Sequence, residues 1–63
     1  MELNDKQKKI LEELKKEEEI ATTKISFLIS ANLYQTESYL DELEEMNLIT
    51  KIEKGHATYW RLK

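Results

Sequence analysis

Residues 22–49, TTKISFLISANLYQTESYLDELEEMNLI, contain two apolar stripes at helical spacing, separated by a short polar segment. The first stripe consists of Ile25, Leu28 and Ile29, with Phe27 beside it. The second lies in a helix expected from about Gln35 to Met46 and consists of Thr36, Tyr39, Leu40, Leu43 and Met46. Residues three and four positions apart share one face of an α-helix. The stretch therefore predicts two amphipathic helices joined by a tight turn.

Local signals indicate where these two helices begin and end. Thr22 or Thr23 is the expected N-cap of the first, because a hydroxyl can accept a hydrogen bond from a free N–H of the first helical turn. Residues 30–33, SANL, predict the turn, and Asn32 is the residue there best able to adopt a left-handed conformation. Asn47, after the second helix, can adopt the same conformation at a helix C-terminus.

Upstream of this pair, the sequence predicts one more helix. Asn4 or Asp5 is the expected N-cap, and the like charges of residues 17–19, EEE, are expected to end the helix. Its inward stripe consists of Ile10, Leu11 and Leu14. Ile20 and Ala21 then form an apolar bridge with room for one small strand.

Downstream of the pair, the apolar period changes from helical to alternating, which predicts a β-hairpin. The expected elements are a strand over 48–53, a turn over 54–56 that contains the only glycine, and a return strand over 57–63. Because side chains alternate across a strand, Trp60 and Leu62 are expected to face the core, and Tyr59 and Arg61 to face solvent.

These elements predict an α+β fold in which three helices pack as a bundle and carry a C-terminal two-stranded β-hairpin, or wing. A chain of 63 residues allows one domain, which we place over residues 1–63. Such a chain buries only about 60% of the surface that its unfolded form exposes. The large apolar side chains are therefore needed first for the core.

Composition argues against several classes of protein. With no cysteine and one histidine, His56, the chain offers neither a disulfide framework nor the usual metal ligands, and no cofactor is expected. No apolar run reaches the roughly 20 residues that span a membrane, and the N-terminus lacks a signal-peptide core, so we expect a cytoplasmic protein. Enzyme motifs are missing, and so small a domain is expected to lack a cleft of several hundred Å³. We expect neither catalysis nor a small-molecule ligand.

Charge is unevenly distributed, although the net charge is −3. Residues 34–48 contain five acidic and no basic residues, whereas residues 49–63 contain four basic residues and one acidic. A basic C-terminal hairpin favours contact with nucleic-acid phosphates, although isolated strand charges are often simply solvated. The nucleic-acid interpretation requires that Arg61 and the lysines near it lie on one side of the hairpin.

The pattern resembles the winged helix-turn-helix regulators, most closely their archaeal-type members, with the MarR and ArsR groups as relatives. The matching residues are Asn32-Leu33, then residues 39–45 (YLDELEE), Leu48-Ile49, and Trp60-Arg61-Leu62. The resemblance implies a DNA-binding transcription regulator in the winged-helix fold. It also implies that the third helix enters the major groove of double-stranded DNA and that the wing lies along the backbone.

By position, the resemblance implies a set of nucleic-acid-binding residues. On and before the third helix these are Lys24, Tyr34, Gln35 and Ser38, and on the wing they are Lys51, Lys54, His56, Tyr59 and Arg61. The chain departs from the pattern at Glu37, Asp41 and Glu42, where relatives often have Arg, Ser or Lys. Carboxylates there repel phosphates, so contact through the first turn of the helix is favoured over deep insertion.

Two partner hypotheses stand beside DNA. The acidic third helix could dock a basic protein, which would make the domain a protein-interaction module within a larger assembly. A homodimer could form through the first helix if Ile10, Leu11 or Leu14 is left exposed. Dimerisation would give a weak monomeric DNA binder useful specificity.

Overall fold

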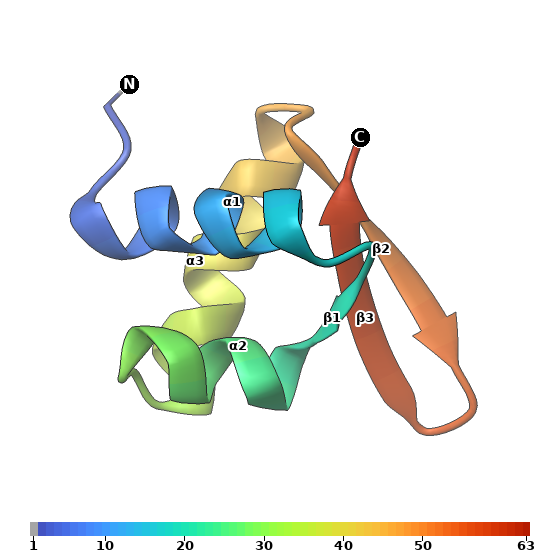
Figure 1. Cartoon of the computed structure of the whole chain (residues 1–63). Helices are drawn as coiled ribbons and strands as arrows, with labels where there is room; N and C mark the ends of the chain where they lie inside the picture. The colour runs from blue at the N-terminus through green and yellow to red at the C-terminus, as the bar shows by residue number, and fades with distance from the viewer. Residues whose placement is uncertain (1) are drawn as a thin grey trace.

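The computed structural model describes residues 2–63 and contains three helices and a three-stranded antiparallel sheet (Figure 1). The elements are α1 (Asp5–Lys16), β1 (Ile20–Ala21), α2 (Thr22–Ile29), α3 (Leu33–Glu45), β2 (Ile49–Lys54) and β3 (Ala57–Leu62). The predicted bundle and C-terminal hairpin are confirmed. Met1, which we included in the predicted domain, lies outside the described residues.

The sheet has one strand more than the two-stranded wing that the sequence predicts. Its order is β1-β3-β2, so β3 is the central strand and Ile20 lies opposite Trp60. The predicted hairpin leaves one edge of β3 unpaired, and the two residues of β1 pair with that edge. This pairing also fixes the end of α1 and the start of α2 against the wing.

The ends of α1 follow the sequence signals. The Asn4 side chain accepts a hydrogen bond from the Gln7 N–H at 2.7 Å, and the Gln7 side-chain oxygen accepts one from the Asn4 N–H at 3.1 Å. These reciprocal bonds form a capping box. The helix ends at Lys16, just before the three glutamates, as predicted.

Two predicted details of the turn between α2 and α3 are wrong. Ser30, not Asn32, takes the left-handed conformation, with φ of 55°. Asn32 has φ of −74° and caps α3 instead, because its side chain accepts a hydrogen bond from the Gln35 N–H at 2.7 Å. A capping side chain at Asn32 lets α3 begin at Leu33, two residues earlier than expected.

The start of α2 also differs from the prediction, whereas the end of α3 agrees with it. Ala21 is the N-cap of α2 and has no capping side chain, so neither Thr22 nor Thr23 performs that role. At the other end of the pair, Asn47 has φ of 63° and takes the left-handed conformation that we expected of it.

The core lies between the three helices and one face of the sheet. Its buried apolar members are Ile10, Leu14, Ile20, Ile25, Ile29, Leu40, Leu43, Ile49 and Trp60, and Leu11, Leu28, Tyr39 and Leu62 pack against it. Trp60 is therefore a core residue, as predicted. Of the apolar stripe of α1, Ile10 and Leu14 are buried in this core and Leu11 is partly buried, so Leu11 is the member left for the dimer that the sequence analysis considered.

Candidate nucleic-acid interface

The start of α3 and the tip of the hairpin lie at the same end of the molecule. In Figure 1 both are at the lower end, while α1 and the C-terminal end of β3 lie at the upper end. A hollow of about 250 Å³ is lined by Leu33 at the start of α3, by Glu37 one turn later, and by His56 in the hairpin turn. The first turn of α3 and the wing tip thus form one continuous surface.

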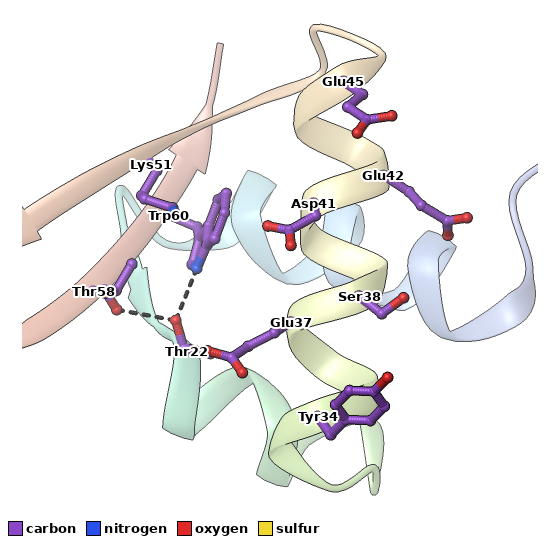
Figure 2. A pocket seen from close by; sticks show the side chains of 10 residues that line it. All are labelled: Thr22, Tyr34, Glu37, Ser38, Asp41, Glu42, Glu45, Lys51, Thr58 and Trp60. Atoms are coloured by element: carbon purple, nitrogen blue, oxygen red, sulfur yellow. Dashed lines mark hydrogen bonds between the residues drawn. The ribbon is translucent and has the colours of Figure 1, made fainter.

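A hydrogen-bonded link holds the wing against α2. The buried Trp60 donates from its Nε1 to the Thr22 hydroxyl at 2.8 Å, and that hydroxyl donates to the Thr58 carbonyl at 3.2 Å (Figure 2). Thr22 therefore satisfies the one polar atom of the indole ring and joins α2 to the central strand. Its hydroxyl is used here rather than as a helix cap.

An open groove runs between α3 and the sheet (Figure 2). Its volume is about 560 Å³, and it is lined by Thr22, Tyr34, Glu37, Ser38, Asp41, Glu42, Glu45, Lys51, Thr58 and Trp60. The expectation that this domain lacks room for a cleft of several hundred Å³ is therefore wrong. The reason is geometric: α3 packs on the core through its inner stripe, and its outer half stands away from the hairpin.

Carboxylates line the α3 side of this groove. In Figure 2, Asp41 points toward Trp60 and Glu37 toward Thr22, and Glu45 follows one turn after Asp41. None of these three carboxylates forms an ion pair within residues 2–63. The α3 wall of the groove is thus a row of carboxylates without ion-pair partners, and among the described residues that line the groove there is one cation, Lys51.

Glu42, which sequence reasoning grouped with Glu37 and Asp41, is held differently. Its side chain lies on the opposite side of α3 from Asp41 (Figure 2) and accepts a hydrogen bond from Nε2 of Gln7 at 2.8 Å. Gln7 is a buried residue of α1, and its side chain faces α3. Glu42 is therefore partly occupied in joining these two helices.

The cations of the wing do not gather on one face, so the expectation of a basic hairpin face is wrong. A nucleic-acid interface can then rest only on the wing tip beside the start of α3, and not on the hairpin as a whole. The Lys51 ammonium lies 5.5 Å from the centre of the Trp60 ring, whereas the Lys54 ammonium lies 5.3 Å from that of Tyr59. Adjacent residues of a strand point to opposite faces of the sheet. Lys51 therefore shares the groove face with Trp60, and Lys54 and Arg61 share the other face with Tyr59.

Near the tip, Lys54 also pairs with a carboxylate. Its ammonium donates a hydrogen bond to Glu19, which precedes β1. This hydrogen bond raises the pKa of Lys54 above its usual value, so the ammonium is charged at neutral pH. Any phosphate that contacts Lys54 must compete with Glu19.

The remaining predicted contact residues lie on different elements, and all of them except Tyr59 are exposed. Lys24 lies in the first turn of α2, and Gln35 and Ser38 lie on the first two turns of α3. Tyr34 is 82% exposed on α3, and the side chain of Tyr59 is half-buried beneath Lys54. The structure thus brings Tyr34, Ser38 and Lys51 to the groove and His56 to the adjoining hollow.

Sequence reasoning missed two exposed apolar side chains. Leu33 was assigned to the turn, but it is the first residue of α3 and is 49% exposed. Phe27 was placed beside the inward stripe of α2, but it is 82% exposed. Its spacing from Ile25 and Ile29, two residues from each, was the available signal, because residues two apart lie on nearly opposite sides of a helix.

Within residues 2–63, no three His, Asp or Glu side chains are grouped so that they could hold a metal ion. Among the helices of this same range, none is both long and apolar enough to cross a membrane.

Comparison with known sequences assigns the chain to a family. Residues 6–63 match the family described as FaeA-like protein. The chain belongs to this family. No protein of curated function matches the sequence of this FaeA-like chain.

Solved structures share the fold of the FaeA-like chain. The adhesin competence repressor AdcR of Streptococcus pyogenes matches 98% of the chain with a TM-score of 0.90 and 15% identity. A possible transcriptional regulatory protein of Mycobacterium bovis matches 94% with a TM-score of 0.84 and 25% identity. Lactococcus lactis ZitR in complex with DNA matches 100% with a TM-score of 0.86 and 21% identity.

These neighbours are longer than the FaeA-like chain. It covers 48% of the AdcR chain, 62% of the M. bovis fragment and 44% of the ZitR chain. ZitR is described as a zinc-responsive MarR family member. The resemblance to winged helix-turn-helix regulators, and the fold that it implied, are thus confirmed, whereas these neighbours give no support to the archaeal-type placement.

Proposed function

We propose that this FaeA-like chain is a DNA-binding domain of a transcription regulator. The observation that carries the proposal is the surface on which the capped start of α3 lies beside the wing tip, with His56 and Leu33 lining one hollow. An α-helix fits the major groove of duplex DNA, and a neighbouring loop can then reach the backbone. ZitR, which has the same fold, has been solved in complex with DNA, and this supports DNA binding as the function of the fold.

Within this proposal, the first two turns of α3 approach the bases and the wing tip contacts phosphates. Tyr34, Gln35 and Ser38 are the base-facing residues, and Lys24, Lys54 and His56 are the phosphate contacts. Lys51, Tyr59 and Arg61 lie further along the wing. Because the row of carboxylates continues along α3 to Glu45, the later turns of the helix stay further from the backbone.

The small number of cations predicts weak, salt-dependent binding. Two of the proposed phosphate contacts, Lys24 and Lys54, are cations at pH 7. Two neutralised phosphates correspond to a slope of about −2 for the logarithm of the binding constant against the logarithm of salt concentration. Two copies with their α3 helices about 34 Å apart would occupy successive turns of the duplex and increase specificity. Ile10 and Leu14 are buried and Leu11 is only partly so, which leaves a small apolar area on α1 for such a pair.

Fluorescence anisotropy with a labelled random-sequence duplex at about 50 and about 200 mM salt tests the proposal. We expect Lys54→Gln and Lys24→Gln each to weaken binding and to reduce the salt slope by about one. Lys8→Gln, at an exposed position on α1, is the matched control and should bind as the unchanged protein does. Absence of binding at the lower salt, or equal loss with all three variants, contradicts the proposal.

A second candidate function is docking of a basic protein segment, and the unpaired carboxylates of the groove favour it. Asp41 and Glu45 lie one turn apart on the groove wall and have no ion-pair partner within residues 2–63. A double Asp41→Asn, Glu45→Gln variant separates the two functions. It should bind duplex DNA more tightly if the groove faces phosphates, whereas it should lose a lysine-rich test peptide if the groove is the docking site.

A further inference from the structure

We propose that α3 selects A·T over G·C base pairs by major-groove contacts, chiefly to thymine methyl groups. The inference rests on the proposed DNA binding and names the base pairs that the same surface prefers. It follows from the chemistry of the exposed side chains on the first two turns of α3.

The first argument is that α3 lacks the side chains that best read guanine. Residues 33–45, LYQTESYLDELEE, contain neither lysine nor arginine. In the major groove, guanine presents two acceptors, N7 and O6, and arginine or lysine is the usual donor to them. Glu37 and Asp41, exposed on this helix, are acceptors and would repel that edge. Carboxylates can accept from the amino group of cytosine as well as from that of adenine, so they do not separate the two base pairs, and the argument against G·C is the missing donor to guanine.

The second argument concerns the two apolar side chains at the start of α3. Leu33 is 49% exposed and Tyr34 is 82% exposed, and they are consecutive residues of the first turn. Thymine carries the only methyl group on the major-groove edges of the four bases, and apolar side chains contact it favourably. Leu33 lines the hollow beside the wing tip and Tyr34 lines the groove, so these two side chains lie on both sides of the first turn of α3.

The third argument concerns Gln35, the next residue of the same turn. Its backbone N–H is held by the Asn32 side chain at 2.7 Å, which fixes the position of the residue. Its side-chain amide makes no hydrogen bond within residues 2–63 and is exposed. A glutamine amide can donate to N7 and accept from N6 of adenine at once. One A·T pair thus matches both the amide and the apolar side chains of this turn.

Competition with four alternating copolymers tests the inference: poly(dA-dT), poly(dA-dU), poly(dI-dC) and poly(dG-dC). Uracil lacks only the thymine methyl group, and inosine gives the I·C pair the minor groove of A·T with the major groove of G·C. We expect poly(dA-dT) to compete best. Poly(dA-dU) should compete less well, by about fourfold for each methyl group buried. Poly(dI-dC) and poly(dG-dC) should be the weakest.

Alanine variants test whether Leu33 and Tyr34 cause the preference for poly(dA-dT) over poly(dA-dU). Leu33→Ala and Tyr34→Ala should bring the binding of poly(dA-dT) and poly(dA-dU) toward equality. Phe27→Ala removes an aromatic ring of α2 that is as exposed as Tyr34, at 82%, and it should leave the ratio unchanged. If all variants lose the discrimination alike, the assignment to α3 is overturned.

The outcomes distinguish this inference from the proposed function. Equal competition by all four polymers overturns the inference and leaves DNA binding intact. Equal competition by poly(dA-dT) and poly(dI-dC) indicates minor-groove readout and also overturns it. No binding to any polymer at low salt overturns the proposed function itself.

Discussion

Thr22→Val is the substitution that best tests how the wing is held. The variant keeps the shape of the side chain and removes the hydroxyl that joins Trp60 to Thr58. Because Trp60 is 2% exposed, its Nε1–H would then be buried without an acceptor. Leaving a buried donor unsatisfied costs about 1–3 kcal/mol, so we expect the free energy of unfolding to fall by that amount.

Urea denaturation followed by tryptophan fluorescence measures this change directly, because Trp60 is the only tryptophan. The midpoint should fall while the dependence on urea stays the same, since a lost hydrogen bond leaves the buried surface nearly unchanged. In thermal denaturation, each kcal/mol should lower Tm by about 4–8 °C in a domain of this size.

Thr23→Val is the matched control for this experiment. Thr23 is the next residue of α2, and its side chain is exposed. The control should therefore change stability by less than about 0.5 kcal/mol. If Thr22→Val is no more destabilising than Thr23→Val, the hydroxyl does not hold the wing, and the reasoning from the Trp60 hydrogen bond is wrong.

Three further predictions follow from single contacts. Glu19→Gln should free Lys54 for phosphate and tighten duplex binding in anisotropy titrations; unchanged affinity would show that Lys54 makes no DNA contact. Asn32→Ala removes the cap of α3 and should lower stability by about 1 kcal/mol in urea denaturation, whereas Asn32→Asp should retain most of it. The hydrogen bond to Glu19 raises the pKa of Lys54, so its stabilisation is complete below the unfolded-state pKa and is lost as pH rises through the folded-state pKa. Across the alkaline range, Tm should therefore fall more in the unchanged protein than in Glu19→Gln, and parallel curves would contradict this.

Much of the fold could be predicted because it depends on local periodicity. The stripes that contain Ile10, Ile25 and Leu40 each mark one face of a helix, and alternation around Trp60 marks the hairpin. The pairing of β1 with β3 could not be predicted in this way. It joins residues about 40 positions apart through only two residues of strand, so no local pattern specifies it.

The candidate site was less predictable than the fold. The faces of the wing cations could have been read from strand alternation, because Lys51 and Lys54 are an odd number of positions apart. The groove could not be predicted from the sequence, because its width depends on the distance of α3 from the sheet. The role of the Thr22 hydroxyl was equally hidden, because it depends on Trp60 reaching it from the other end of the chain.

An NMR titration of the isotope-labelled chain with a short duplex tests the central claim most directly. If the winged surface binds DNA, amide signals of residues 32–38 and 54–57 should shift with added duplex, and those of α1 should remain in place. Shifts concentrated on α1, or a spectrum that does not change at low salt, would contradict the account.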